Sequence, residues 1–217
     1  MRKVTLTFDN GPEPEVTPVV LDCLSRHDIK SSFFVLGHKV SEPARRDLAK
    51  RARDAGHLIG NHTFSHRTPL GNLSEHEALA EFERTEEALA WLDQKDRYFR
   101  PYGGGGAIGP HLLHPVVVEQ MKLRAMTCVI WNVVPRDWSK PVGWVERALE
   151  MIHAHPWSLV VLHDVPSGAM NQLDEFIETL YEEGTEFVQE FPPECVPIVR
   201  GRIVLPIEPY VYSGIRK

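Results

Sequence analysis

The fold is decided by the stretch KVTLTFDNGP at residues 3–12, in which apolar and polar residues alternate before a polar turn. This alternation is typical of a β-strand, here residues 3–8. A helical pattern, with apolar residues at three-to-four spacing, follows at residues 16–26, and strand–helix units repeat down the chain. The repetition predicts an α/β fold with a parallel sheet, either a closed or distorted barrel or a doubly wound sheet.

The other predicted elements alternate in the same way. Further strands are expected at residues 31–36, 57–60, 98–100, 125–131, 159–162 and 196–199. Further helices are expected at residues 42–55, 74 to near 93, 110–121, 144–153 and 172–182, the second of which opens with a capping box at Ser74 and Glu77. No internal repeat or low-complexity linker interrupts them, so we expect residues 1–217 to form a single domain.

The composition is that of an ordinary globular protein, with 42% hydrophobic and 25% charged residues. The net charge is −6 and no segment is rich in lysine and arginine, which argues against nucleic acid or an anionic membrane as a partner. Without the apolar core of a signal peptide or an apolar run of membrane length, the chain is expected to be cytoplasmic. Cys23, Cys128 and Cys195 are widely spaced and are expected to be reduced and packed.

Polar side chains follow the first and third predicted strands, and chemistry gathers at such strand ends in folds of this class. Asp9 and Asn10 follow the first strand, where a simple turn is the alternative interpretation. His62 and His66 follow the third strand, and two histidines four residues apart can share one face of a helical turn and bind one metal. The chain has 11 histidines, so a chance pair is the alternative there.

Three later segments carry further candidates. Arg100 enters the glycine run at residues 103–106, which suits the binding of a carboxylate and the stabilisation of an oxyanion by backbone N–H groups. A phosphate-binding loop is disfavoured, because the chain has no GxxxxGK[ST] motif. Residues 131–138 read WNVVPRDW. His163 ends the apolar run at residues 159–162, where it would either donate a proton near neutral pH or lie on the surface.

Five short motifs occur in a fixed order: TFDNGP at residues 7–12, NHTFSH at 61–66, FRPYG at 99–103, WNVVPRDW at 131–138 and LHD at 162–164. In this order they resemble the five signature motifs of the polysaccharide deacetylase family, the NodB-homology domains of carbohydrate esterase family 4 type. The resemblance spans residues 4–164, and each motif follows a predicted strand, which argues against coincidence.

The resemblance implies a distorted (β/α) barrel and a hydrolase that removes acetyl groups from N-acetylated sugars with a divalent metal, expected to be zinc. It implies that Asn10, His62 and His66 are the metal ligands. It also implies further roles: Asp9 as general base, Arg100 to orient it, His163 as general acid, Asp137 to tune that histidine, and Tyr102, Trp138 and Leu162 to bind substrate, the first of these through its backbone N–H.

Three departures from the family pattern bear on the substrate more than on the reaction. Asn10 stands where the family usually has aspartate, so the site loses one negative charge, and we expect metal binding to weaken by about 10–100-fold. Val134 stands where the fourth motif usually has its first aspartate. The third motif is one residue shorter than the usual Arg-Pro-Pro-Tyr, which affects the placement of Tyr102.

The leading hypothesis is therefore hydrolysis of a small N-acylated sugar or oligosaccharide. A metal-independent hydrolase of a cyclic ureide or imide is one alternative, because two of the family's aspartates are replaced. A glycan-binding pseudoenzyme is the other, although a protein that only binds needs no separate acid and base such as His163 and Asp9. The sequence indicates neither an oligomeric state nor a role for the segment after Asp164.

Overall fold

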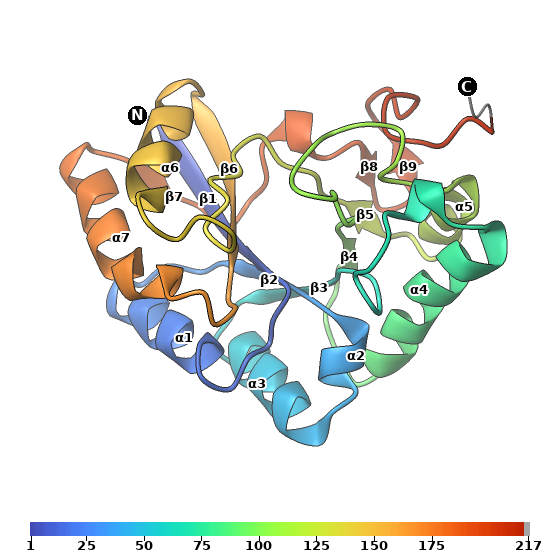
Figure 1. The fold of residues 1–217 in the computed structure, drawn as a ribbon, viewed down its shortest axis with the longest axis horizontal. Coiled ribbons are helices and arrows are strands. Elements are labelled where there is room, and N and C mark those ends of the chain that lie inside the picture. The colour runs from blue at the N-terminus through green and yellow to red at the C-terminus, as the bar shows by residue number, and fades with distance from the viewer. Residues whose placement is uncertain (215–217) are drawn as a thin grey trace.

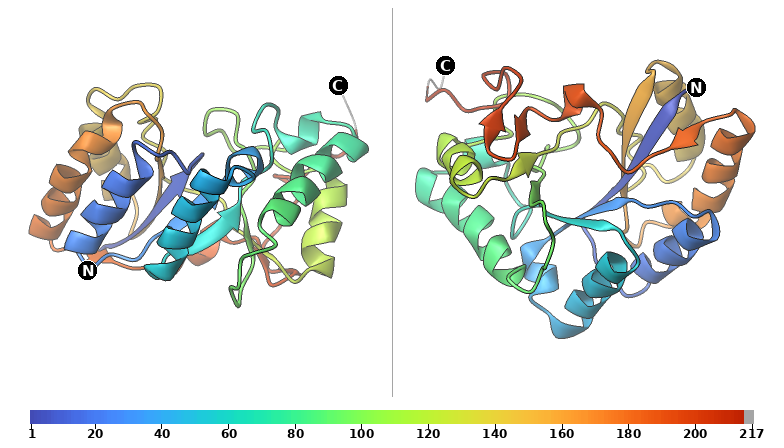
Figure 2. Two further views of the ribbon diagram at one scale, coloured as in Figure 1. Left: turned by 90° about the horizontal axis from the view of Figure 1, so that it is seen from below. Right: turned by 180° about the vertical axis from the view of Figure 1, so that it is seen from behind.

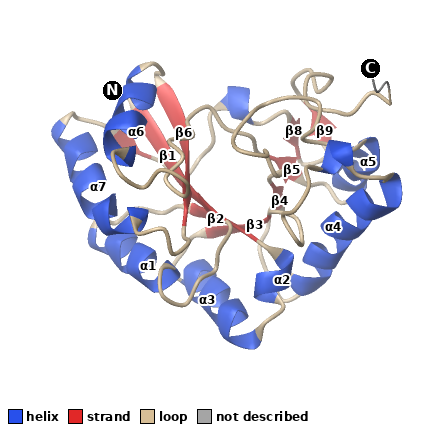
Figure 3. Ribbon diagram, in the orientation of Figure 1, coloured by secondary structure: helices blue, strands red, loops and turns tan. Residues whose placement is uncertain are grey.

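A computed structural model describes residues 1–214 as a curled sheet with helices along its outer side (Figure 1), and Figure 3 separates strands from helices by colour. The described strands are β1 (Lys3–Asp9), β2 (Ser32–Val35), β3 (Leu58–Asn61), β4 (Tyr98–Phe99), β5 (Thr127–Cys128), β6 (Trp157–His163), β7 (Glu186–Phe187), β8 (Ile198–Val199) and β9 (Arg202–Ile203). They are ordered β6-β1-β2-β3-β4-β5-β8-β9, and β7 pairs with β1. All pairs are parallel except β5–β8 and β8–β9. This confirms the α/β class and a distorted barrel.

The helices follow one another around the outside of the curl, as two further views show (Figure 2). They are α1 (Thr17–Arg26), α2 (Gly37–Val40), α3 (Pro43–Asp54), α4 (Glu75–Ala88), α5 (Pro115–Leu123), α6 (Trp144–His153) and α7 (Leu173–Glu182). Short 3-10 turns lie at Leu70–Asn72, Ala169–Gln172 and Pro193–Cys195. Within residues 1–214, no helix has the length and apolar character needed to cross a membrane.

Every predicted helix and strand is present, and the differences lie at their ends. The bounds of α6 are as predicted, whereas α5 begins at Pro115 instead of residue 110, because His114 caps it and proline occupies its first turn. β5 is two residues long, shorter than the predicted 125–131. Sequence analysis missed α2, β7 and β9, which are too short to display a hydrophobic period.

β6 separates two apolar layers, because alternate side chains of a strand point to opposite faces. Val160 and Leu162 pack in the outer layer with the apolar faces of α1, α6 and α7, whereas Leu159 and Val161 pack inside the curl. Leu162 is fully buried in that outer layer, so the expectation that it lines a substrate groove is wrong. Its neighbour Val161 faces the cavity instead.

The segment after β5 crosses to the opposite edge of the curl. Val133 forms a parallel bridge with Val160 of β6, in which its N–H donates to the Leu159 carbonyl at 3.1 Å. Its own carbonyl accepts from the Val161 N–H at 2.9 Å. This crossing partly closes the barrel and brings the fourth motif to the carboxyl end of β6.

Candidate active site

The carboxyl ends of neighbouring strands carry the residues that the sequence singles out. Asp9 is the Cα partner of His163 in the β1–β6 pair. Asn61 is the partner of Phe99 in the β3–β4 pair, so His62 and Arg100 follow two adjacent strand ends. Because all four strands are parallel, four of the five motifs meet at one edge of the sheet.

Asp9 is held by a buried arginine. Its Oδ1 accepts from Arg100 Nη1 at 2.8 Å, and the same nitrogen donates to Thr7 Oγ1 at 2.7 Å. Arg100 is 0% exposed, and its guanidinium carbon lies 4.0 Å from the centroid of the Phe34 ring. The charge-assisted hydrogen bond fixes the direction of the carboxylate and leaves Oδ2 beside His62, whose Nε2 lies 3.4 Å away.

His62 and His66 lie in an irregular turn after β3 and not on a shared helical turn, as the spacing had suggested. Left-handed backbone at Thr63 (φ 68°) and His66 (φ 55°) turns the chain so that the ring centroids of the two histidines lie 4.8 Å apart. His62 Nδ1 donates to the Arg100 carbonyl at 2.8 Å, so the lone pair on Nε2 is available to bind a metal. Burial lowers the pKa of both imidazoles, that of His66 to about 2, so both are neutral and suited to metal binding.

Asn10 has a left-handed backbone (φ 74°), which asparagine adopts more readily than most residues. Its backbone carbonyl accepts from Lys39 Nζ at 2.6 Å, and Lys39 also pairs with Glu13, so the loop after β1 is clamped. The side-chain Oδ1 of Asn10 is buried and has no hydrogen-bond partner in the described part of the chain. An unsatisfied buried oxygen of this kind costs about 1–3 kcal/mol, and a bound cation would satisfy it.

These donors fit a divalent metal. Two neutral imidazoles and one unpartnered oxygen make a nitrogen and oxygen set open towards a cavity, an arrangement that zinc accepts, although zinc prefers a carboxylate to an amide. Asn10, His62 and His66 would hold the ion, as expected from the sequence. Their role as ligands stays a prediction.

His163, at the end of β6, is fixed by a buried carboxylate. Asp137 is 0% exposed and accepts twice from this histidine, from Nδ1 at 2.9 Å and from the backbone N–H at 2.9 Å. The bond to Nδ1 selects the tautomer that leaves Nε2 available to a substrate. The Trp138 ring packs against the imidazole with 4.3 Å between centroids.

A cavity of about 300 Å³ lies over these groups. Among the site residues that the family resemblance implies, those that line it are Asp9, Asn10, His62, His66, Tyr102, Trp138 and His163. Tyr102 reaches it by packing on His66, with 3.8 Å between ring centroids. Trp131, Val134, Trp138 and Val161 make one wall apolar, and the acid, amide and imidazole groups make the other polar.

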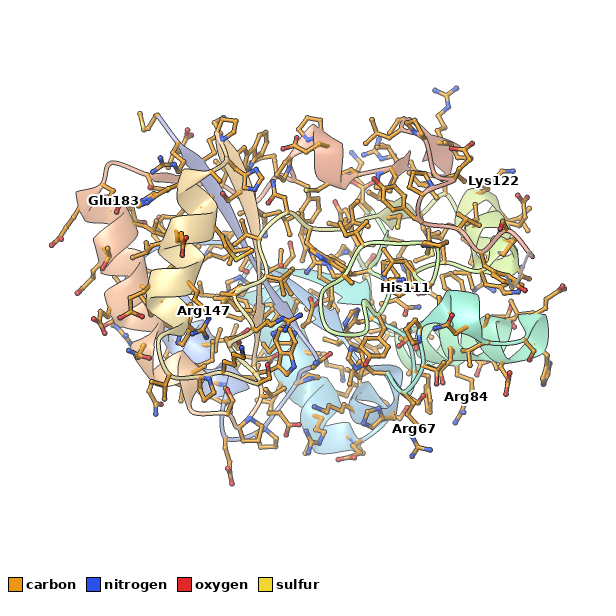
Figure 4. All side chains as sticks on the ribbon, turned by 45° about the horizontal axis from the view of Figure 1, so that its top comes forward. Arg67, Arg84, His111, Lys122, Arg147 and Glu183 are labelled. Carbon is orange, nitrogen blue, oxygen red and sulfur yellow. The ribbon has the colours of Figure 1, made fainter. Side chains whose placement is uncertain are left out.

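Two residues outside the expected set hold the loops that shape this cavity, and both are labelled in Figure 4. Arg147 of α6 donates to three backbone carbonyls in the loop at 135–142, which contains Asp137. His111 Nε2 lies 3.3 Å from the Gly103 carbonyl oxygen. These contacts span 5–12 residues and follow no motif or hydrophobic period, so the sequence pattern did not indicate them.

Another buried acid, Asp164, lies behind the loop after β1. Asp164 accepts a hydrogen bond from Thr17, and its carboxylate packs so closely on Gly11 that a β-carbon there would lie 2.1 Å from Oδ2. Only glycine therefore fits at this position. Burial raises the pKa of Asp164 to about 7. The LHD motif was the only sequence signal for Asp164, and it gave no indication of this contact.

Comparison with known proteins identifies the family. A family model described as "Polysaccharide deacetylase" matches residues 1–108. A chitooligosaccharide deacetylase from Rhizobium leguminosarum bv. trifolii is 35% identical over 75% of this chain and 72% of its own length. A peptidoglycan-N-acetylglucosamine deacetylase from Bacillus cereus is 31% identical over 86% of this chain and 66% of its own length.

A solved structure is similar as well. A pseudoenzyme of carbohydrate esterase family 4 from Bacillus anthracis has a TM-score of 0.71 and 28% identity, covering 86% of this chain and 63% of that one. This chain spans 66% of the Bacillus cereus relative and 38% of the peptidoglycan-N-acetylglucosamine deacetylases of Listeria monocytogenes. The ordered motifs, the curled sheet and these matches agree: the chain belongs to the polysaccharide deacetylase family.

Proposed function

We propose that this protein is a metal-dependent hydrolase that removes N-acetyl or similar acyl groups from an amino-sugar-containing carbohydrate. The observation that carries the proposal is the separation of two proton-transfer groups across one cavity. Asp9 is held by Arg100 and His163 by Asp137, while both face the space that Asn10, His62 and His66 line. Amide hydrolysis needs both a base for water and an acid for the departing amine.

When bound, zinc would supply polarisation of the amide carbonyl and of a water molecule. Asp9 accepts the proton of the attacking water, since its Oδ2 faces the cavity while Oδ1 is committed to Arg100. The backbone N–H of Tyr102 is the donor proposed for the developing oxyanion. The position of Tyr102 on the cavity wall supports this proposal.

His163 completes the reaction by donating the proton on Nε2 to the departing amine. Asp137 stabilises the imidazolium from which that proton comes and keeps Nδ1 protonated afterwards, so the ring returns to the same orientation. Acid and base are then different groups with opposite protonation states.

A small N-acylated sugar or oligosaccharide is the proposed substrate. Relatives are named for chitooligosaccharide and for peptidoglycan N-acetylglucosamine, which share an N-acetylated amino sugar. The apolar wall of Trp131, Val134, Trp138 and Val161 suits the methyl end of an acyl group, and the polar wall suits its carbonyl.

A glycan-binding pseudoenzyme is the second candidate, because Asn10 replaces a charged ligand and a similar fold is described as a pseudoenzyme in Bacillus anthracis. The Asp9–Arg100 and His163–Asp137 pairs argue for catalysis, since binding alone requires neither. A metal-independent hydrolase of cyclic ureides or imides is the remaining alternative.

A substrate panel tests the proposal. Zinc-loaded protein is incubated with N-acetylated chito-oligosaccharides and, separately, with a cyclic imide, and products are identified by mass spectrometry. Deacetylated sugar is the expected product, and His163→Ala is the control for background hydrolysis. Opening of the cyclic imide without deacetylation would favour the metal-independent alternative, and binding of the oligosaccharide without turnover would favour the pseudoenzyme.

We also propose that the protein works in the cytoplasm. Cys23, Cys128 and Cys195 are buried and unpaired in the described chain, as is usual in a reducing compartment. Immunodetection after cell fractionation tests this, and recovery in the extracellular fraction would contradict it.

A further inference from the structure

A cluster of metal-binding side chains lies on the outer helices, away from the cavity. Cys23 and His27 lie one turn apart at the end of α1, and Asp174 lies in the first turn of α7. One sulfur, one ring nitrogen and one carboxylate oxygen of these residues all lie within 4.8 Å of one another. Figure 1 shows the two helices side by side on the outer layer.

The spacing of these donors is close to that of a metal site. Asp174 Oδ1 lies 2.7 Å from His27 Nε2 and 3.5 Å from Cys23 Sγ. Ligand atoms bound to one tetrahedral zinc at about 2.0–2.3 Å lie roughly 3.3–3.8 Å apart. The histidine–carboxylate pair has to open slightly to admit an ion, and the cysteine sulfur and the histidine nitrogen lie within 4.8 Å of each other.

The chemistry of the donors selects the kind of ion. A thiolate, an imidazole and a carboxylate together suit zinc, or cobalt as its substitute, and not calcium or magnesium, which prefer oxygen ligands. We propose that Cys23, His27 and Asp174 form a second, peripheral site for a zinc-type cation that joins α1 to α7. Water completes the coordination from the side of Asp174, whose side chain is 48% exposed.

Arg26 competes for this site. Its Nη2 lies 2.9 Å from Asp174 Oδ1, the oxygen that also faces His27 and Cys23. The arginine side chain is 58% exposed, and ion pairs on the surface are weak, so an arriving cation displaces it readily. Arg26 therefore holds the carboxylate in place before the ion binds and leaves when it does.

The thiol gives the site a distinctive signature. Burial raises the pKa of Cys23 to about 12, so its sulfur keeps its proton until a metal displaces it. The donors expected at the cavity, Asn10, His62 and His66, include no sulfur. A thiolate-to-cobalt absorption band in the near ultraviolet therefore reports on the peripheral site alone, whether or not the protein is a deacetylase.

Cobalt titration of the full chain, stripped beforehand with chelator, tests the proposal. The wild type is expected to develop the thiolate band and to bind two equivalents of metal. Cys23→Ser is expected to lose the band and one equivalent of metal. Asp174→Asn is expected to weaken the affinity for the cobalt ion that gives the band at least tenfold, and Arg26→Gln is expected to raise that affinity.

Cys195→Ala is the matched control, because it removes a buried thiol elsewhere and should leave the band unchanged. Circular dichroism verifies that each variant is folded. If Cys23→Ser does not fold, the surface substitution Asp174→Asn still tests the site. No thiolate band in the wild type at saturating cobalt, or a band that persists in Cys23→Ser, would overturn the proposal.

Discussion

Asp9 and His163 are Cα partners at the carboxyl ends of the adjacent parallel strands β1 and β6. The register of one strand pair therefore sets the spacing between the proposed base and the proposed acid. Each is fixed by a different buried partner, Arg100 for Asp9 and Asp137 for His163. The two groups can thus hold opposite protonation states in one cavity, which general acid–base catalysis requires.

Replacement of the proposed acid should separate catalysis from metal binding. His163→Ala is expected to lower turnover by about 10²–10⁴-fold, the usual contribution of a general acid, because the variant lacks the proposed proton donor. Zinc content, measured by mass spectrometry of the metal, should be unchanged. His76→Ala removes an exposed histidine and is the matched control. Normal turnover in His163→Ala would remove this residue from the mechanism.

Restoring a carboxylate beside the histidines should strengthen the metal site. Asn10→Asp adds one negative charge at the position of the unpartnered Oδ1, and we expect zinc affinity to rise about 10–100-fold, with turnover rising as well. Calorimetric titration with zinc measures the affinity. Asn171→Asp adds the same charge at an exposed position and should have no effect. If both variants bind zinc like the wild type, Asn10 does not contact the metal.

The Asp9–Arg100 pair should behave as a buried unit in unfolding experiments. Arg100→Met leaves a carboxylate without its partner in a dry environment, so we expect a loss of about 3–5 kcal/mol in the free energy of unfolding. Asp9→Asn combined with Arg100→Met should be less damaging than Arg100→Met alone, because no charge is then left unpaired. Urea unfolding of the single and double variants measures this. A double variant less stable than Arg100→Met would contradict the coupling.

Much of the site was predictable because the motifs follow strands, and parallel strands end at one edge of a sheet. This placed Asp9, His62, Arg100 and His163 together before any geometry was known. The orientation of Leu162 was not predictable in this way. A motif match identifies a segment of the strand, but the pleat of the strand determines which of its side chains points into the cavity. Here that residue is Val161.

Other contacts depend on the fold and were not predictable. Lys39 reaches Asn10 from a helix too short to show a pattern, and Arg147 reaches the loop of Asp137 from a helix that looks ordinary in sequence. The left-handed turn that brings His62 and His66 together has no periodic signal either. Contacts of this kind are set by the packing of the fold, and no motif or hydrophobic period in the sequence encodes them.

The buried carboxyl of Asp164 should make stability depend on pH. Its pKa is about 7 in the folded chain against an ordinary value of 3.8, so folding favours the protonated form. The stability that this group contributes is complete below pH ~4 and is lost as the pH rises through ~7. Asp164→Asn, which stays neutral, should remove this decline and gain most over the wild type at pH 8.

Urea unfolding at pH 5 and pH 8 measures the effect of Asp164. Asp54→Asn, which changes an exposed acid at the end of α3, is the matched control and should keep the wild-type slope. Parallel pH profiles for the wild type and Asp164→Asn would mean that Asp164 titrates as an ordinary carboxyl.

We propose that an amide hydrolase operates here with Asn10 in place of a charged metal ligand. The decisive measurement is acetate release from N-acetylated chito-oligosaccharides by protein stripped with chelator and then given back zinc or cobalt. We predict no release from stripped protein and release that returns with either metal. Equal release with and without metal, or none in any state, would contradict metal-dependent deacetylation by this protein.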